Sequence, residues 1–133
     1  MKEVSKEEYN RLSEIIIGGA IAVHRELGPG LLESAYEACL QFELLDRGLR
    51  VERQKEQAII YRGIKIDCGY KIDLLVEDLI ILELKAVEKF HPIYEAQLMS
   101  YLKLSGCRLG LLMNFNVRVL KDGIKRLVLN FPD

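Results

Sequence analysis

The chain has 133 residues, which fits one domain of common size and leaves little room for two. Half of the residues are hydrophobic, enough to build a core, and no apolar run reaches the roughly 18 residues that a membrane span needs. The N-terminal segment MKEVSKEEYN lacks the apolar stretch of a signal peptide. We therefore expect a single cytoplasmic domain over residues 1–133 with no membrane partner.

Charge is distributed unevenly along the chain, although the net charge is only −1. Residues 1–84 hold 11 Lys and Arg against 16 Asp and Glu, whereas residues 85–133 hold 8 against 4. The imbalance is consistent with ordinary solvated faces. It is also consistent with a basic flank beside an acidic metal site, as phosphate binding would need.

Several functional classes lack their signatures in this sequence. The three cysteines are widely spaced and form no C-x-x-C pair, which argues against a disulfide framework and a zinc site. No phosphate-binding loop, dinucleotide fingerprint or G-x-S-x-G elbow is present.

Helical periodicity and capping signals predict three helices. The first spans residues 6–27, where Ser5 can cap the helix and Glu8 completes a capping box. The second spans residues 31–47 and precedes Gly48, and the third spans residues 93–104.

Apolar segments separated by turn signals predict five strands, at residues 51–61, 64–76, 79–86, 107–115 and 124–129. The first three are joined by short turns and should be antiparallel. The helix before the fourth should make that strand parallel to one of them. The result is an α/β (α+β) domain with the order α-β-β-β-α-β and a mixed central sheet flanked by helices.

The predicted arrangement of strands brings two carboxylates and a lysine close together. Glu83 and Lys85 lie two residues apart on one strand and therefore share a face, and Asp73 lies on the preceding strand. Such carboxylates can hold Mg²⁺ or Mn²⁺, while the lysine can orient a water or neutralise a phosphate. The alternative is a Glu83–Lys85 ion pair at an exposed strand end.

Asp73 and Glu83 can form one site only if the turn between their strands has the right length. A two-residue turn at Glu77-Asp78 would pair Asp73 with Leu82 and point Asp73 away from Glu83. The site therefore predicts an odd-length turn or a β-bulge.

The motifs occur in the order Gly69-x-x-x-Asp73, Glu83-x-Lys85 and Gln97-x-x-x-Tyr101. This series resembles the PD-(D/E)XK nuclease superfamily, particularly its RecB-like exonuclease branch. Upstream, Gly30-x-x-Glu33-x-x-Tyr36 resembles the signature of the GxxExxxY family, which is grouped with these nucleases, with a spacing one residue shorter than that name. Together the resemblance covers about residues 8 to 130.

The resemblance implies a ligand set for Mg²⁺ or Mn²⁺. Asp73 and Glu83 would be ligands, together with the backbone carbonyl of Leu84. Glu33, where RecB-like enzymes often have a histidine, would be an additional acidic ligand or would position a water. Read from the residues alone, Glu33 is equally an exposed residue near a helix N-terminus.

The resemblance also implies roles for Lys85 and the third helix. Lys85 would be the catalytic lysine. Gln97 and Tyr101 are four residues apart and share a helix face with Tyr94, and this face would look onto the Lys85 end of the strand and hold a water or substrate phosphate. The alternative is a helix edge with a half-buried tyrosine.

The function predicted first is a metal-dependent nuclease that hydrolyses phosphodiester bonds of DNA or RNA. The alternative is a catalytically silent PD-(D/E)XK-fold binding or scaffold module. No motif in the sequence supports a third function, an enzyme that acts on small molecules with a similar sheet. The sequence is also compatible with a homodimer.

Overall fold

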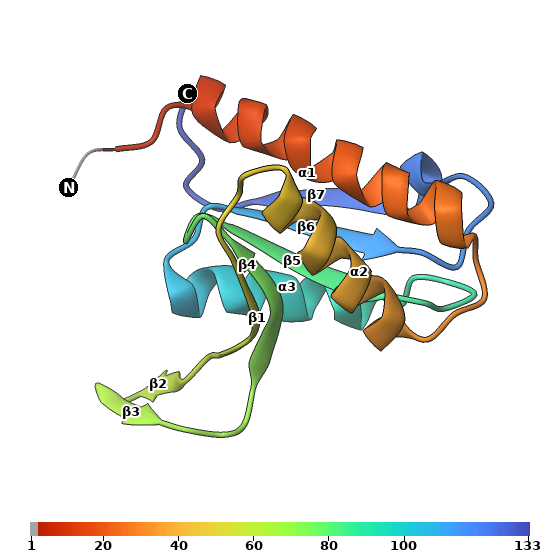
Figure 1. The fold of residues 1–133 in the computed structure, drawn as a ribbon. Coiled ribbons are helices and arrows are strands. Elements are labelled where there is room, and N and C mark those ends of the chain that lie inside the picture. The colour runs from red at the N-terminus through yellow and green to blue at the C-terminus, as the bar shows by residue number, and fades with distance from the viewer. Residues whose placement is uncertain (1–2) are drawn as a thin grey trace.

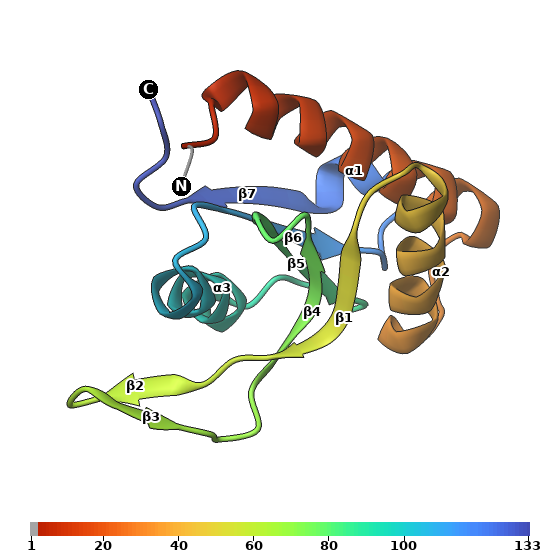
Figure 2. The same ribbon diagram turned by 60° about the vertical axis from the view of Figure 1, so that its left-hand side comes forward.

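A mixed β-sheet separates two helical layers in the computed structural model, which describes residues 3–133 (Figure 1). Helices α1 (Lys6–Leu27) and α2 (Glu33–Asp46) cover one face, and α3 (Pro92–Ser105) covers the other (Figure 2). A short 3₁₀ helix, η1 (Leu120–Gly123), precedes the last strand. Within residues 3–133, none of the helices has the length and apolar character to cross a membrane.

The sheet has five strands in the order β1-β4-β5-β6-β7. They are β1 (Val51–Glu56), β4 (Lys71–Val76), β5 (Ile80–Lys85), β6 (Leu109–Asn114) and β7 (Ile124–Val128). Only β5 and β6 are parallel, because α3 returns the chain across the sheet between them. The predicted fold class, a mixed sheet flanked by helices, is therefore confirmed.

The helix boundaries follow local capping chemistry. Ser5 Oγ accepts a hydrogen bond from the Glu8 amide at 3.1 Å, as predicted, but the Glu8 carboxylate pairs with Arg11 instead of closing the capping box. Helix α2 begins two residues later than predicted, at Glu33. Helix α3 begins at Pro92, where the preceding His91 accepts a hydrogen bond from Ile93 through Nδ1.

The prediction of unbroken strands at residues 51–61 and 64–76 is wrong. Each divides in two, and the outer parts, β2 (Ile59–Tyr61) and β3 (Ile64–Ile66), pair only with each other. They form a two-stranded ribbon that projects from the sheet on the α3 side (Figure 2). The main-sheet strand β1 contains Gln54 at a φ of 55°, which interrupts the extended backbone shortly before the ribbon begins.

Strand β5 is buried on both faces, as its apolar sequence predicted. Leu82 and Leu84 belong to the larger core under α1 and α2, and Ile81 belongs to the smaller core under α3. Glu83 and Lys85 alternate with Leu82 and Leu84 and therefore point to the α3 side. The sheet thus places both polar side chains between β5 and α3.

Tyr36 anchors the connection that leads into α2. Its ring is fully buried and stacks on Phe115 with centroids 4.6 Å apart. Its hydroxyl donates to the Gly28 carbonyl at 2.6 Å and accepts from the Leu31 amide at 3.1 Å. The tyrosine of the Gly-x-x-Glu-x-x-Tyr segment therefore fixes the position of α2 in the fold.

We expect Tyr36→Phe to lower the free energy of unfolding by about 1–3 kcal/mol, because it leaves two backbone groups without their partner. Urea denaturation monitored by circular dichroism measures this change. Tyr61→Phe is the matched control, since Tyr61 is 62% exposed on the ribbon. Equal stability of the two variants would contradict the anchoring role.

Candidate metal centre

The turn between β4 and β5 has three residues. Val76 pairs with Ile80, so Glu77, Asp78 and Leu79 form the connection, with Glu77 and Asp78 at φ angles of 55° and 56°. The predicted odd-length turn is confirmed. The pairing of Leu74 with Leu82 is the last of this ladder, and its continuation by one residue sets Asp73 opposite Glu83. The two carboxyl groups are neighbours, because Asp73 adds to the effect of burial on the pKa of Glu83 through repulsion and a hydrogen bond.

Asp73 is held by two hydrogen bonds at the point where β4 and β5 separate. Its Oδ2 accepts from the Leu84 amide at 2.9 Å, and its Oδ1 accepts from Gln54 Nε2 at 3.3 Å. Because one bond comes from the backbone of β5, the carboxylate is fixed against the strand that carries Glu83.

Glu83 is a buried carboxyl group with an unused oxygen. The side chain is 7% exposed, and within residues 3–133 its Oε1 has no hydrogen-bond partner. Burial, repulsion from Asp73 and a hydrogen bond with the Asp73 carboxyl raise the pKa of Glu83 from 4.5 to about 10, against the opposing effect of Lys85. In the absence of a cation, Glu83 is therefore protonated at neutral pH.

Lys85 follows Glu83 on the same side of β5 and is only half-buried. Its Nζ lies 4.7 Å from the centroid of the Tyr94 ring on α3, a cation–π distance. The salt bridges of residues 3–133 do not include a Glu83–Lys85 pair, and Glu83 is not at an exposed strand end. The alternative of a surface ion pair is therefore wrong.

Helix α3 presents Tyr101 to the two carboxyl groups. Burial and the neighbouring Glu83 and Asp73 raise the pKa of the Tyr101 hydroxyl. Gln97, one turn earlier, is exposed and lines a cleft of about 510 Å³ together with Tyr101. The contacts of Tyr94 and Tyr101 agree with the expectation that this face of α3 looks onto the Lys85 end of β5.

The structure does not add Glu33 to the carboxylate pair. Glu33 is the exposed first residue of α2. Within residues 3–133, no group of three or more His, Cys, Asp or Glu side chains is arranged to hold a metal ion. Of the predicted ligands, the structure therefore brings together Asp73, Glu83 and the backbone of Leu84.

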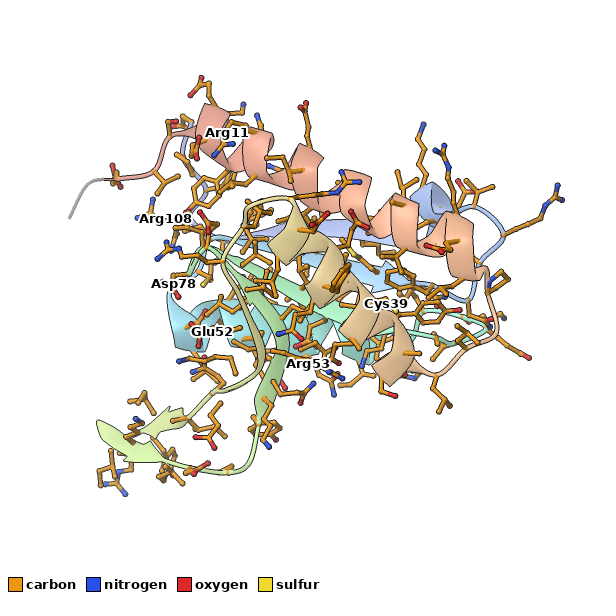
Figure 3. The ribbon with its side chains drawn as sticks, viewed as in Figure 1. Arg11, Cys39, Glu52, Arg53, Asp78 and Arg108 are labelled. Carbon is orange, nitrogen blue, oxygen red and sulfur yellow. The ribbon has the colours of Figure 1, made fainter. Side chains whose placement is uncertain are left out.

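A second buried acid, Glu37, was missed from the sequence. It is 6% exposed on α2, and its Oε1 accepts from Arg53 Nε at 2.9 Å and from Gln54 Nε2 at 2.7 Å. Figure 3 shows Arg53 between β1 and α2. The signal was present, because Glu37 lies at helical spacing from the buried Leu40 and Leu44.

Gln54 connects this acid to the site. Its side-chain amide bridges Glu37 and Asp73, and its backbone has the left-handed φ of 55° that is rare for a residue other than glycine. Opposite it, β4 loses its regular alternation, since Ile72 packs in the α3-side core and Leu74 in the other. The distortion of both strands thus coincides with the position of Asp73.

The sequence profile of the PD-(D/E)XK nuclease superfamily matches residues 10–127, nearly the whole chain. The chain belongs to the PD-(D/E)XK nuclease superfamily. Nucleases of this superfamily generally use Mg²⁺ or Mn²⁺. No curated protein and no solved structure matches the chain at a significant level. The likeness to the GxxExxxY family rests on residues 30–36 alone.

The raised pKa of Glu83 predicts how the stability of this PD-(D/E)XK domain depends on pH. The folded protein binds the Glu83 proton more tightly than the unfolded chain, so stability contributed by this group is lost as pH rises from 4.5 to about 10. Urea unfolding in EDTA across this range should show the decline. Glu83→Gln should flatten it, and an unchanged slope in that variant would assign the decline to other groups.

Proposed function

We propose that this chain is a Mg²⁺- or Mn²⁺-dependent nuclease that hydrolyses phosphodiester bonds of DNA or RNA. The observation that carries the proposal is the buried, unpartnered Oε1 of Glu83 beside the Asp73 carboxyl group. Two adjacent carboxyl groups of this kind cannot both ionise without a neighbouring positive charge. A divalent cation supplies that charge.

The donors available are the oxygen donors that hard cations prefer. Asp73 and Glu83 would provide carboxylate ligands, and the backbone carbonyl of Leu84 would provide a third oxygen. Glu33, the exposed first residue of α2, lies outside the carboxylate pair and would contribute only through a water. The cation would offset negative charge on the scissile phosphate and acidify the attacking water.

Lys85 is the group that acts on the reacting atoms in this proposal. It lies two residues beyond Glu83 on the same face, and the ring of Tyr94 supports its ammonium group at 4.7 Å. Lys85 would orient the attacking water or stabilise charge that grows on the phosphate. Gln97 and Tyr101 would position the phosphate or water from α3.

Removal of the lysine tests the chemistry. We expect Lys85→Ala to keep the fold and to lower the rate of cleavage by about 100-fold or more, because it removes an interaction with the transition state. The assay uses labelled single-stranded and duplex DNA and RNA with Mg²⁺ or Mn²⁺, and EDTA as a control. Lys121→Ala is the matched variant, since Lys121 is exposed on η1.

Two outcomes of this assay would count against the proposal. Cleavage that survives Lys85→Ala undiminished would place the activity elsewhere or in a contaminant. Absence of EDTA-sensitive cleavage on every substrate would favour the silent binding or scaffold module.

Metal binding can be tested without turnover. Saturating Mn²⁺ should raise the melting temperature, because a ligand that binds only the folded state adds about 2.7 kcal/mol at 100 times its Kd. Asp73→Asn should remove most of this shift. Asp78→Asn, in the exposed turn at the far end of β4, should keep it. An equal shift in both variants would mean that the metal binds elsewhere.

A further inference from the structure

A cleft lies between α3 and the ribbon, and most of the residues that line it have no role in the proposed hydrolytic step. Its volume is about 510 Å³, within the range of pockets that enclose small organic groups. Nine residues line it: Ile59, Tyr70, Ile93, Ala96, Gln97, Ser100, Tyr101, Lys103 and Leu104. Tyr101 lies both in the cleft lining and near the carboxyl groups of Glu83 and Asp73.

The lining combines aromatic rings, polar side chains and one positive charge. The rings of Tyr70 and Tyr101 meet edge to face with centroids 6.3 Å apart. Gln97 and Ser100 supply hydrogen-bond donors and acceptors, and Lys103 is the only charged residue in the lining. Flat apolar surface, polar groups at its edge and a cation without an accompanying acid suit a nucleobase attached to a phosphate backbone.

We propose that this cleft holds an unpaired nucleobase, so that the substrate class is single-stranded or locally unpaired nucleic acid. The inference rests on the proposed nuclease function for the position of the phosphate. A base inside a duplex has both faces covered by its neighbours and must leave the stack before it can pack on a protein ring. The tyrosines of the cleft can therefore contact only a base that is free of the helix.

The spacing along the chain connects the cleft to the metal ligands. Tyr70 immediately precedes β4, and Asp73 lies three residues later on the same segment. Three residues of extended chain span at most roughly 10 Å. One strand of nucleic acid can thus place a base on Tyr70 and Tyr101 while a neighbouring phosphate lies at Asp73 and Glu83.

A second copy of this chain is the competing occupant. The ribbon exposes Ile60, Tyr61 and Ile64, which are each more than half exposed. These side chains do not line the cleft, so a self-association surface on the ribbon would differ in composition from the cleft itself. The charge and polar groups of the lining favour the nucleotide.

Binding in EDTA tests the inference separately from cleavage. The probes are a labelled oligothymidylate of about 12 nucleotides, a matched duplex, and an oligomer of the same length with abasic sugars throughout. We expect the oligothymidylate to bind more tightly than the abasic oligomer. Tyr70→Ala should weaken its binding by about 5- to 150-fold, the range for loss of an aromatic stacking platform.

Three comparisons give the result its meaning. Tyr70→Phe should retain binding, because the ring remains. Tyr61→Ala should also retain it, because Tyr61 lies on the ribbon outside the cleft. The abasic oligomer should bind wild type and Tyr70→Ala equally, since the base and the ring act as one pair in a double-mutant cycle.

The inference is overturned if the abasic and normal oligomers bind wild type equally, or if Tyr70→Ala leaves binding unchanged. It is also overturned if sedimentation shows a dimer that Tyr70→Ala dissociates, which would assign the cleft to a second copy. If the protein cleaves nucleic acid with Mg²⁺ but binds the abasic and normal oligomers equally, the base-binding inference is wrong and the nuclease proposal stands. Base-dependent binding without cleavage of any substrate removes the nuclease proposal and supports the binding site.

Discussion

The burial of Glu83 in the central strand is the constraint around which the site is organised. A carboxyl group at that position loses its hydration and lies against a second carboxyl group, Asp73. The Leu84 amide and the Gln54 side chain donate to Asp73, but no group among residues 3–133 bonds to Oε1 of Glu83. The two neighbouring carboxyl groups therefore lack a positive charge strong enough to let both ionise, and a bound cation would supply it. Their position is between β5 and α3, next to Lys85.

Support for the site comes from several elements that carry no reactive group. Tyr36 fixes the entry to α2, and α2 carries Glu37 to the β1 crossing, where Arg53 and Gln54 neutralise and engage it. Gln54 then reaches Asp73. A continuous set of hydrogen bonds therefore runs from Glu37 on α2 through Gln54 to Asp73, and it determines how the Asp73 carboxyl group is oriented before any ligand arrives.

The sequence predicted the helices, the mixed sheet and the convergence of Asp73, Glu83 and Lys85, because these depend on local periodicity and strand parity. It also required the odd-length turn, which follows from the same parity. It failed at the ribbon, since the residues of β2 and β3 are typical of strands and only their pairing with each other separates them from β1 and β4. The helical spacing of Glu37 from Leu40 and Leu44 could have indicated its burial, but its partners Arg53 and Gln54 come from β1, and no local pattern encodes that contact.

The three-residue connection between β4 and β5 has a consequence for variants of this chain. Only Asp78 is exposed, because Glu77 contacts Arg50 and Leu79 packs against the larger core. Glu77 and Asp78 also have left-handed φ angles, which restricts the residue types that fit there. The length of the connection is restricted as well, because inserting or deleting one residue would invert every β4 side chain relative to β5. A variant that keeps Asp73 and Glu83 on one face of the sheet is therefore expected to keep three residues in this connection.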